Sequence, residues 1–337
     1  MKQNNRQIPS ALVSVIVPAY SRVPLLRECL ASIRAQTWPY WECIVVDDAS
    51  PLGEEICAVV QAMEDQRFRY IRRQENAGPA AARNTGIGAS RGEFFVCVDE
   101  DDRLVPRAIE KLLGEILQRN CDVVCPQAAF FEGKSGIRRA ILPSVEQMLV
   151  GMWVLPNGWI MKRGLWQRLG GYDESPILLG RDDWEFWIRV VAHWAKVAVL
   201  DEVLYEYRIP IDSGADEPSL EHRVRRQEVG CAAYVIAKHR SLYVKHPMQK
   251  RVLLQRSCRL EAEYHERKGC LYRAALRRCQ EAWYGRDAKS VRRAVKAILR
   301  ALVGERRLES MLRWKRQIVG ALRAQSARWW SGCDSPQ

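Results

Sequence analysis

Residues 94–102 read Phe-Phe-Val-Cys-Val-Asp-Glu-Asp-Asp, so that an uninterrupted apolar run ends in four consecutive acids. A continuous apolar run, rather than an alternating one, predicts a strand that is buried on both faces of a sheet. The acids would then lie at the carboxyl end of the strand, where open α/β sheets bind ligands. Four adjacent like charges repel one another, so either solvent screens them or their oxygens bind a hard divalent cation. The stretch predicts a cation site, with an acidic surface turn as the alternative.

On both sides of this stretch, short apolar segments alternate with segments of helical periodicity. Strands are expected over 13–17, 42–46, 68–72, 94–98 and 122–126, and helices over 22–36, 54–65, 80–89 and 106–117. This alternation, with short links, predicts an α/β fold with a mainly parallel sheet and helices on both faces. Polar clusters follow the strands at Tyr20, Asp47-Asp48, Asn76 and 99–102, so we expect them to gather along one edge of the sheet.

The second half of the chain changes character twice. Residues 130–158 have no clean period, which predicts a substrate loop. Residues 184–195 then carry a helical apolar stripe, and strands are expected over 196–200 and 203–207. Beyond Pro218 the pattern becomes basic amphipathic helices, as over 271–278, 290–299 and 312–319. We therefore predict an α/β domain over 1–218 and an all-α basic region over 219–337.

Charge and cysteine usage limit the function classes. The chain of 337 residues has a net charge of +13, and from residue 221 onward 28 Lys and Arg face 10 Asp and Glu. The first 220 residues carry 25 against 30, so a mildly acidic body precedes a strongly basic tail. The eleven cysteines form no CxxC pair, which favours reduced core residues in the cytosol. No signal peptide or long apolar span is evident, so we expect a cytoplasmic protein without a transmembrane helix.

Five segments, in this order, resemble the family 2 glycosyltransferases. They are Val-Ser-Val-Ile-Val-Pro-Ala-Tyr at 13–20, Val-Val-Asp-Asp-Ala-Ser at 45–50, Asn-Ala-Gly-Pro-Ala-Ala-Ala-Arg-Asn at 76–84, residues 92–102, and Arg-Asp-Asp-Trp-Glu-Phe-Trp at 181–187. The resemblance spans residues 12–210 and implies a GT-A fold, which is Rossmann-like. It also implies inverting transfer of a sugar from a nucleoside-diphosphate donor to a hydroxyl of a glycan or lipid-linked acceptor, in cell-surface polysaccharide or lipopolysaccharide synthesis.

The resemblance also implies a set of donor-binding residues. A diphosphate must be neutralised before it leaves, which a divalent metal such as Mn²⁺ or Mg²⁺ does when carboxylates hold it. By the match to the family's DxD motif, Asp101 ligates the metal and Asp99 contacts the ribose or the waters of the metal. Asp48 matches the acid that hydrogen-bonds the nucleobase or ribose, and a turn-forming role is its alternative. The residues that would frame the base are Pro18, Ala19 and Tyr20, with core packing as the alternative for Tyr20.

On the acceptor side, Asp183 is the candidate general base, because the reaction needs one carboxylate to remove the acceptor proton. The family pattern there is Glu-Asp, so the shorter Asp182 leaves the role of the first acid open. The alternative for Asp183 is a helix N-cap. Arg83 is expected to balance the acids or touch the diphosphate, unless it is a solvated helix residue. Supporting roles are assigned to Asn84, which would pin a loop, and to Asp102, for which capping the next helix is the alternative.

The basic tail and the overall activity each leave rival hypotheses. Amphipathic helices with tryptophans and cations suit an anionic membrane surface, which predicts a peripheral location on the inner face of the cell membrane. Packing on the body, or self-association into an oligomer, is the alternative, and no nucleic-acid module is recognisable. The family's processive Gln-x-x-Arg-Trp pattern is absent. A non-catalytic nucleotide-binding adaptor is the rival function, and a nucleotidyltransferase is disfavoured because no Gly-rich basic loop follows the first strand.

Overall fold

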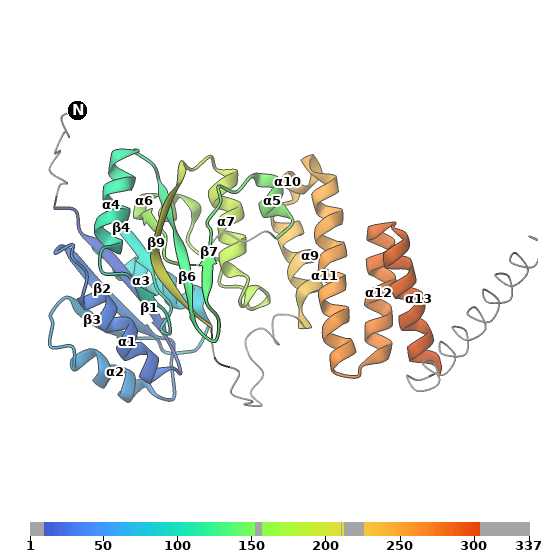
Figure 1. The fold of residues 1–337 in the computed structure, drawn as a ribbon, viewed down its shortest axis with the longest axis horizontal. Coiled ribbons are helices and arrows are strands. Elements are labelled where there is room, and N and C mark those ends of the chain that lie inside the picture. Colours follow the sequence, from blue (N-terminus) through green and yellow to red (C-terminus); the bar gives the residue numbers. More distant parts are fainter. Residues whose placement is uncertain (1–9, 152–156, 210, 212–225, 304–337) are drawn as a thin grey trace, which may run out of the picture. The chain divides into compact units, whose positions relative to one another are not determined.

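A computed structural model of the chain describes residues 10–151, 157–209, 211 and 226–303. The chain divides into two compact units, one formed by residues 1–224 with 237–249 and the other by residues 225–236 with 250–337. Residues 237–249 thus belong to the first unit although they follow the boundary at residue 218 that the sequence suggested. Each unit is described by itself below (Figure 1).

The first half of the first unit is a parallel sheet with intervening helices. Three of its strands are almost wholly buried, as expected for continuous apolar runs. The parallel strand order is β3-β2-β1-β4. The elements are β1 (Val13–Ala19), α1 (Val23–Arg34), β2 (Trp41–Asp47), α2 (Gly53–Gln61), β3 (Phe68–Arg72), α3 (Pro79–Ala89) and β4 (Phe94–Cys97).

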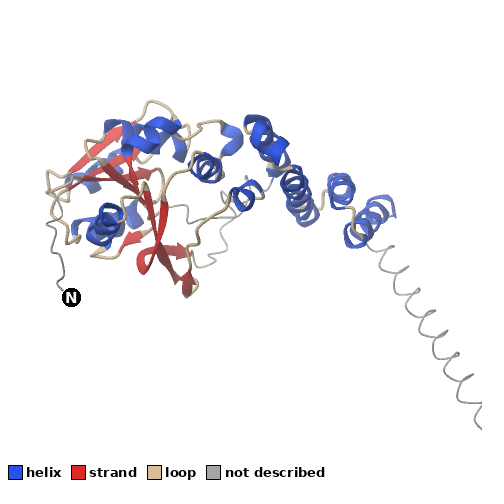
Figure 2. Ribbon diagram, turned by 90° about the horizontal axis from the view of Figure 1, so that it is seen from above, coloured by secondary structure: helices blue, strands red, loops and turns tan. Residues whose placement is uncertain are grey.

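The second half extends the same sheet in the order β4-β8-β6-β9-β5, with β7 paired to β6. Strand β8 runs antiparallel to both of its neighbours, so this half is mixed rather than parallel. The predicted α/β class is confirmed, and helices lie on both sides of the strands in Figure 2. The elements are β5 (Arg103–Leu104), α4 (Ala108–Gln118), β6 (Val123–Glu132), β7 (Gly136–Arg138), α5 (Val145–Leu149), β8 (Ile160–Lys162), α6 (Arg163–Leu169), the 3₁₀ turn Pro176–Leu178, α7 (Asp182–Ala192) and β9 (Val197–Ile209).

Two expectations for this half need correction. The segments 196–200 and 203–207 are parts of one strand, β9, whose pairing with β6 shifts register between Cys125 and Ala128. The span 130–158 is not a single loop, because it contains the end of β6, β7 and α5. Part of it, residues 152–156, lies outside the described residues. Short elements of this kind have too few residues to show a period in sequence.

The later helices are α9 (Glu228–Lys238), α10 (Arg240–Lys245), α11 (Pro247–Arg267), α12 (Leu271–Gly285) and α13 (Ala288–Val303). Helical structure after the α/β domain is as predicted, although the segment 312–319 lies outside the described residues. Within the second unit α12 packs along α13, and the buried Glu281 pairs with Arg278 and Arg293. Among the described helices, none is long and apolar enough to cross a membrane.

Helix α3 lies close to the sheet because a glycine faces strands β1 and β2. A Cβ on Gly86 would come within 2.5 Å of Ile16 Cγ2 and 3.0 Å of Val46 Cγ2, whereas a Cβ on Gly88 would meet no atom within 4 Å. Both strand residues are fully buried, so neither methyl group has room to move aside. The missing side chain therefore sets the distance between α3 and the sheet.

This contact makes a stability prediction. We expect Gly86→Val to lower the free energy of unfolding by about 1–3 kcal/mol, because it overpacks a close-packed interface. The matched control, Gly88→Ala in the same helix, should raise the free energy of unfolding by roughly 0.5–1 kcal/mol through helix propensity. Urea denaturation followed by circular dichroism measures both. Equal stability of Gly86→Val and the wild type would contradict the packing described.

Candidate active site

Glu100, one of the four acids at residues 99–102, joins the carboxyl ends of β1 and β4. Glu100 accepts hydrogen bonds from the backbone N–H of Tyr20 at 3.0 Å and of Ser21 at 3.3 Å. Burial raises the pKa of Glu100, although these N–H groups oppose the rise. Tyr20 itself is 41% exposed, so its side chain does not pack in the core. Pro18 and Ala19 end strand β1 beside β2. The three residues predicted to frame a base thus lie at the ligand-binding edge of the sheet.

The two acids that end β2 hold two different turns. Asp47 accepts from Ser50 N–H at 2.7 Å and from Tyr70 Oη at 2.6 Å, so the turn-forming role considered for Asp48 belongs to Asp47. Asp48 accepts from Gly78 N–H at 2.7 Å and also pairs with Arg73. Gly78 has a φ of 87°, a region that favours glycine, and it precedes the first residue of α3. Asp48 is therefore buried and shapes the entry to α3.

One guanidinium joins the end of β4 to the start of α7. Arg83 on α3 donates from Nη2 to Asp99 Oδ1 at 2.9 Å and from Nη1 to Asp182 Oδ2 at 2.8 Å. The Arg83 side chain is buried, which rules out the solvated alternative. Burial opposes its charge, but the two carboxylates raise the pKa of Arg83 well above its ordinary value. The other oxygen of Asp99 accepts from Asn157 Nδ2 at 2.5 Å.

The acid pair Asp182-Asp183 lies buried in the first turn of α7. Arg181 occupies the N-cap position, and no side chain makes a cap hydrogen bond there, so the N-cap alternative for Asp183 is wrong. Asp183 Oδ1 accepts from Trp184 N–H at 2.7 Å. Burial, together with the neighbouring charge of Asp182, raises the pKa of Asp183 to about 7. A carboxylate with a pKa near neutrality is well matched to general-base work.

Asp102 serves the sheet and does not cap a helix. Strand β5 follows it directly and α4 begins only at Ala108, so the capping alternative is wrong. Asp102 accepts from Tyr205 Oη at 2.7 Å and from Arg208 N–H at 2.8 Å, which ties the end of β4 to β9. Burial, and then the charge of Asp99, raise the pKa of Asp102 to about 7.

Asn84 ties α3 to the turn that follows α6. Its Nδ2 donates to Tyr172 O at 2.9 Å and to Glu174 Oε1 at 2.7 Å, and its Oδ1 accepts from Tyr172 N–H at 2.8 Å. Its Oδ1 also accepts from Trp166 Nε1 on α6 at 3.3 Å, so both the amide nitrogen and the amide oxygen are used on α6 and on that turn. Asn84 thus holds neighbouring backbone, while the adjacent Arg83 reaches the acids.

Comparison with known proteins identifies the family. The family model described as glycosyl transferase family 2 matches residues 14–169. The uncharacterized glycosyltransferase YwdF of Bacillus subtilis is 30% identical over 226 residues, which cover 64% of this chain and 80% of YwdF. The chain belongs to the family 2 glycosyltransferases. It is therefore a glycosyltransferase, and the resemblance seen in its sequence is confirmed.

Two further relatives extend the comparison. WcaA of Escherichia coli, named as a glycosyl transferase of colanic acid biosynthesis, is 33% identical over 103 residues, or 31% of this chain and 37% of WcaA. The crystal structure of S. aureus TarS 1–349 in complex with UDP-GlcNAc superposes with a TM-score of 0.55 at 17% identity, covering 87% of this chain and 92% of that one. At this identity TarS shows a shared fold, which confirms the GT-A prediction.

The acids of this glycosyltransferase do not form a preformed cation cage. In the described part of the chain, no three His, Cys, Asp or Glu side chains are grouped to hold a metal ion. Three of the four acids at 99–102 are engaged by Arg83 and Asn157, by the Tyr20 loop, and by β9. Asp101 is the exception, because its ion pair is with the half-exposed Arg22.

The remaining donor set still fits a metal that arrives with a diphosphate. Mg²⁺ and similar hard cations are commonly bound by one or two carboxylates together with substrate phosphates and waters. Asp101 supplies one such carboxylate, and its partner Arg22 is an exposed side chain that a cation and diphosphate can displace. The chemistry at 99–102 is thus compatible with a single-carboxylate site and not with an all-protein cage.

Several residues of the site were missed in sequence. They are Glu100, Asn157 and Arg208, whose Nε donates to Asp101 O at 2.7 Å. Asn157 follows a segment without periodicity, and Arg208 ends a long strand, so neither position has a local signal. Glu100 is the middle residue of the DxD motif, which assigns roles only to the two outer acids. Glu100 instead accepts hydrogen bonds from the backbone N–H groups of Tyr20 and Ser21, a role that has no sequence pattern.

The raised pKa of Asp183 predicts a pH dependence of stability. An ordinary aspartate titrates near 3.8, whereas folding raises Asp183 to about 7, so the folded chain holds a proton that the unfolded chain has lost between these values. The free energy of unfolding should therefore fall as pH rises through this window. Asp183→Asn cannot ionise, so we expect its Tm to exceed the wild-type Tm by about 2 °C or more near pH 8, and to equal it near pH 4.

A carboxyl shifted in the opposite direction provides the control. Hydrogen bonds from Arg67 lower the pKa of Asp65, so that its ionised form stabilises the folded chain. Asp65→Asn should therefore give no gain in Tm near pH 8. Differential scanning calorimetry across the pH range tests both variants, and an Asp183→Asn Tm at or below wild type near pH 8 would show that Asp183 is not destabilised by ionisation.

Proposed function

We propose that this glycosyltransferase moves a sugar from a nucleoside-diphosphate donor to a hydroxyl of a glycan or lipid-linked acceptor, with inversion at the anomeric carbon. The observation that carries the proposal is the bridge made by Arg83 between Asp99 and Asp182. It brings the strand end expected to bind the donor within one side chain of the helix that carries the candidate base. The shared fold with TarS, solved with UDP-GlcNAc, supports this donor class.

Inversion follows from a single displacement. Asp183 accepts the proton of the acceptor hydroxyl while that oxygen attacks the anomeric carbon and the bond to the diphosphate breaks. A pKa of about 7 leaves a substantial fraction of Asp183 ionised at neutral pH, yet keeps it basic enough to take the proton. One carboxylate is enough for this step, because no covalent sugar intermediate has to form and break. The adjacent Asp182, held by Arg83, supplies the charge that raises the basicity of Asp183.

The donor side is assigned to the ends of β1, β2 and β4. A divalent cation such as Mn²⁺ or Mg²⁺, held by Asp101 and the diphosphate oxygens, would offset the charge that develops on the leaving group. Tyr20 is exposed enough to stack on the base, and Asp48 holds the N–H of Gly78 at the start of α3. Asp99 is held by Arg83 and Asn157 as a ready acceptor for a ribose hydroxyl. Relatives such as WcaA favour an acceptor in polysaccharide synthesis.

Two isosteric variants separate donor binding from transfer. Asp183→Asn should reduce transfer at least about a hundredfold, because the proton has no acceptor, while donor affinity stays within about threefold. Asp101→Asn should instead abolish the effect of Mn²⁺ on donor binding. The donors to screen are UDP, GDP, CDP and dTDP sugars, by the rise in Tm that a ligand of the folded chain causes. Asp201→Asn, at an exposed position, is the control and should match wild type.

The outcomes distinguish the rivals. Transfer by Asp183→Asn within tenfold of wild type would show that another group is the base. Donor binding without transfer by the wild-type chain would favour the non-catalytic adaptor. Unchanged metal dependence in Asp101→Asn would remove Asp101 from the metal site.

We also propose that the α12–α13 surface binds an anionic membrane, which would bring the enzyme to a lipid-linked acceptor. On α12 the side chain of Trp283 is 75% exposed, and on α13 that of Leu302 is 77% exposed. Other exposed apolar residues of these two helices are Tyr272, Leu276, Val291, Val295, Ile298 and Leu299. Cations such as Lys289, Arg292 and Lys296 lie on α13 as well. An apolar stripe beside a basic face suits a layer of anionic headgroups over acyl chains.

The membrane proposal predicts a salt-sensitive association. The affinity for phosphatidylglycerol vesicles, measured by sedimentation, should be at least about tenfold lower in the double variant Trp283→Ser/Leu302→Ser. The reason is that two apolar side chains would no longer be buried in the membrane. Trp194→Ser is the control, because Trp194 is even more exposed, at 91%, but lies in the first unit. Equal sedimentation of the double variant and wild type would refute the proposal. So would a double variant that differs from wild type only in losing a concentration-dependent increase in mass, because that would show that this surface mediates self-association.

A further inference from the structure

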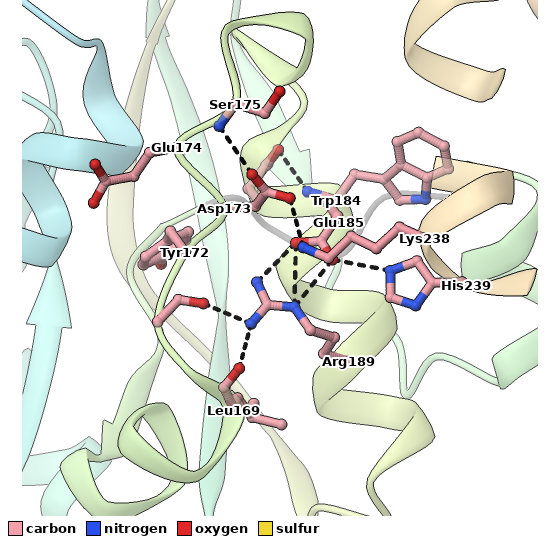
Figure 3. A network of polar contacts seen from close by, with 12 residues as sticks. Leu169, Tyr172, Asp173, Glu174, Ser175, Trp184, Glu185, Arg189, Lys238 and His239 are labelled. Carbon is pink, nitrogen blue, oxygen red and sulfur yellow. Dashed lines mark hydrogen bonds and ion pairs between the residues drawn. The ribbon is translucent and has the colours of Figure 1, made fainter. Parts of the chain in front are cut away.

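A second buried charge cluster lies one helical turn beyond the acid pair of α7. At its centre is Glu185, which has no solvent exposure. Glu185 Oε1 accepts from His239 Nε2 at 2.9 Å and lies 2.9 Å from Lys238 Nζ. Its Oε2 accepts from Arg189 Nη2 at 2.7 Å. Figure 3 shows these side chains converging, and we call Asp173, Glu185, Arg189, Lys238 and His239 the Glu185 cluster.

The cluster connects α7 to the turn that follows α6. Arg189 Nη1 donates to the carbonyl oxygens of Leu169 and Gly171, each at 2.6 Å, and Lys238 Nζ donates to Asp173 Oδ2 at 2.5 Å (Figure 3). The same turn is held from α3 by Asn84. Arg83, the residue beside Asn84 on α3, bonds Asp182 in the first turn of α7. Helix α3 therefore contacts both α7 directly and the turn that the Glu185 cluster also holds.

Two cluster members come from a part of the chain far from the acid pair. Lys238 is the last residue of α9 and His239 precedes α10, and both belong to the first compact unit. On α10 the buried Tyr243 donates from its hydroxyl to Leu149 O at 2.9 Å, and Trp184 on α7 donates to Met148 O at 2.7 Å. Residues 238–243 and α7 thus both hold α5.

The charges of the cluster balance, which makes a positional role physically reasonable. A buried carboxylate without partners is strongly destabilising, so Glu185 needs its cations in order to stay ionised. Burial opposes the ionisation, but hydrogen bonds from His239 and Arg189 lower the pKa of Glu185 to about 2. Arg189 is on α7 itself and moves with it. Arg189 also holds the carbonyls of Leu169 and Gly171 in the turn after α6. Lys238 and His239 are the members that tie Glu185 to the junction between α9 and α10.

We propose that Lys238 and His239 are positioning residues that hold α7, and hence Asp183, in the place required for transfer. Neither reaches the acids of the donor edge, and both act through Glu185. The catalytic unit is then complete only with residues 237–249, which the sequence assigns to the helical tail. This inference rests on the proposed role of Asp183, but the position of α7 can be measured without it.

Hydrogen exchange in the full-length chain tests the positional claim directly. In His239→Ala and Lys238→Met, the backbone amides of 185–192 should exchange at least about tenfold faster than in wild type, because local opening of α7 becomes easier. Amides of β1 should keep their wild-type rates. His246→Ala is the matched control, since His246 lies directly after α10 and its ring is 3.6 Å from the half-exposed Glu146 rather than near Glu185. Wild-type exchange at 185–192 in both variants overturns the proposal, whatever the reaction is.

Kinetics test the consequence for transfer. Both variants should lower kcat about tenfold, because a base displaced by a fraction of an ångström loses its alignment, while the donor Kd stays within about twofold. His239→Gln should restore most of kcat, since its amide N–H donates to Glu185 in place of the ring. An unchanged kcat with faster exchange overturns the proposal. If the wild-type chain transfers no sugar, the proposed function is wrong, and exchange alone decides the role of the Glu185 cluster.

Discussion

The active site depends on a buried positive charge, that of Arg83. Without it, the buried Asp182 would bring an unpaired negative charge into an interior with little solvent to screen it, close to the partly exposed Asp99. Breaking such a buried pair by removing one partner typically costs about 3–5 kcal/mol. Because Arg83 binds one oxygen of each acid, it also fixes where the end of β4 stands relative to the first turn of α7. The contacts of Arg83 that neutralise these carboxylates therefore also fix the distance between the end of β4 and the helix that carries Asp183, the proposed base.

The net charge around Arg83 contributes to the raised pKa of Asp183, the proposed base. One guanidinium is shared by two carboxylates, so the charge of Asp182 is only partly offset and raises the pKa of the adjacent Asp183. Burial makes the larger contribution to this rise, and the charge of Asp182 adds to it. The shortened first acid, Asp182 in place of the family's glutamate, is thus not idle. It is within reach of Arg83 and acts on its neighbour through space.

The sequence predicted those parts of the fold and site that have local signals. Continuous apolar runs predicted β1, β2 and β4, and the acids that follow them were correctly expected at one sheet edge. The mixed half of the sheet was missed because β8 has three residues and reverses direction without any pattern that reports it. The different partners of residues 99–102 could not be predicted, because Tyr20, Arg83 and β9 distinguish these acids and their own sequence does not.

The other residues that the sequence did not predict make contacts between segments far apart in the chain. The two parts of the proposed site are held in different ways, one by the backbone of the sheet and the other by side chains. The donor edge is built from consecutive strand ends, whose backbone is fixed by a buried parallel sheet. Helix α7 lies outside that ladder, so its position comes from side chains, which include its buried apolar residues, Arg83 and the Glu185 cluster. A strand end can shift only if the sheet shifts, whereas on the proposed role of Lys238 and His239 two residues at the α9–α10 junction set the position of α7. The proposed acceptor side is then the part that sequence change can adjust without disturbing the proposed donor side.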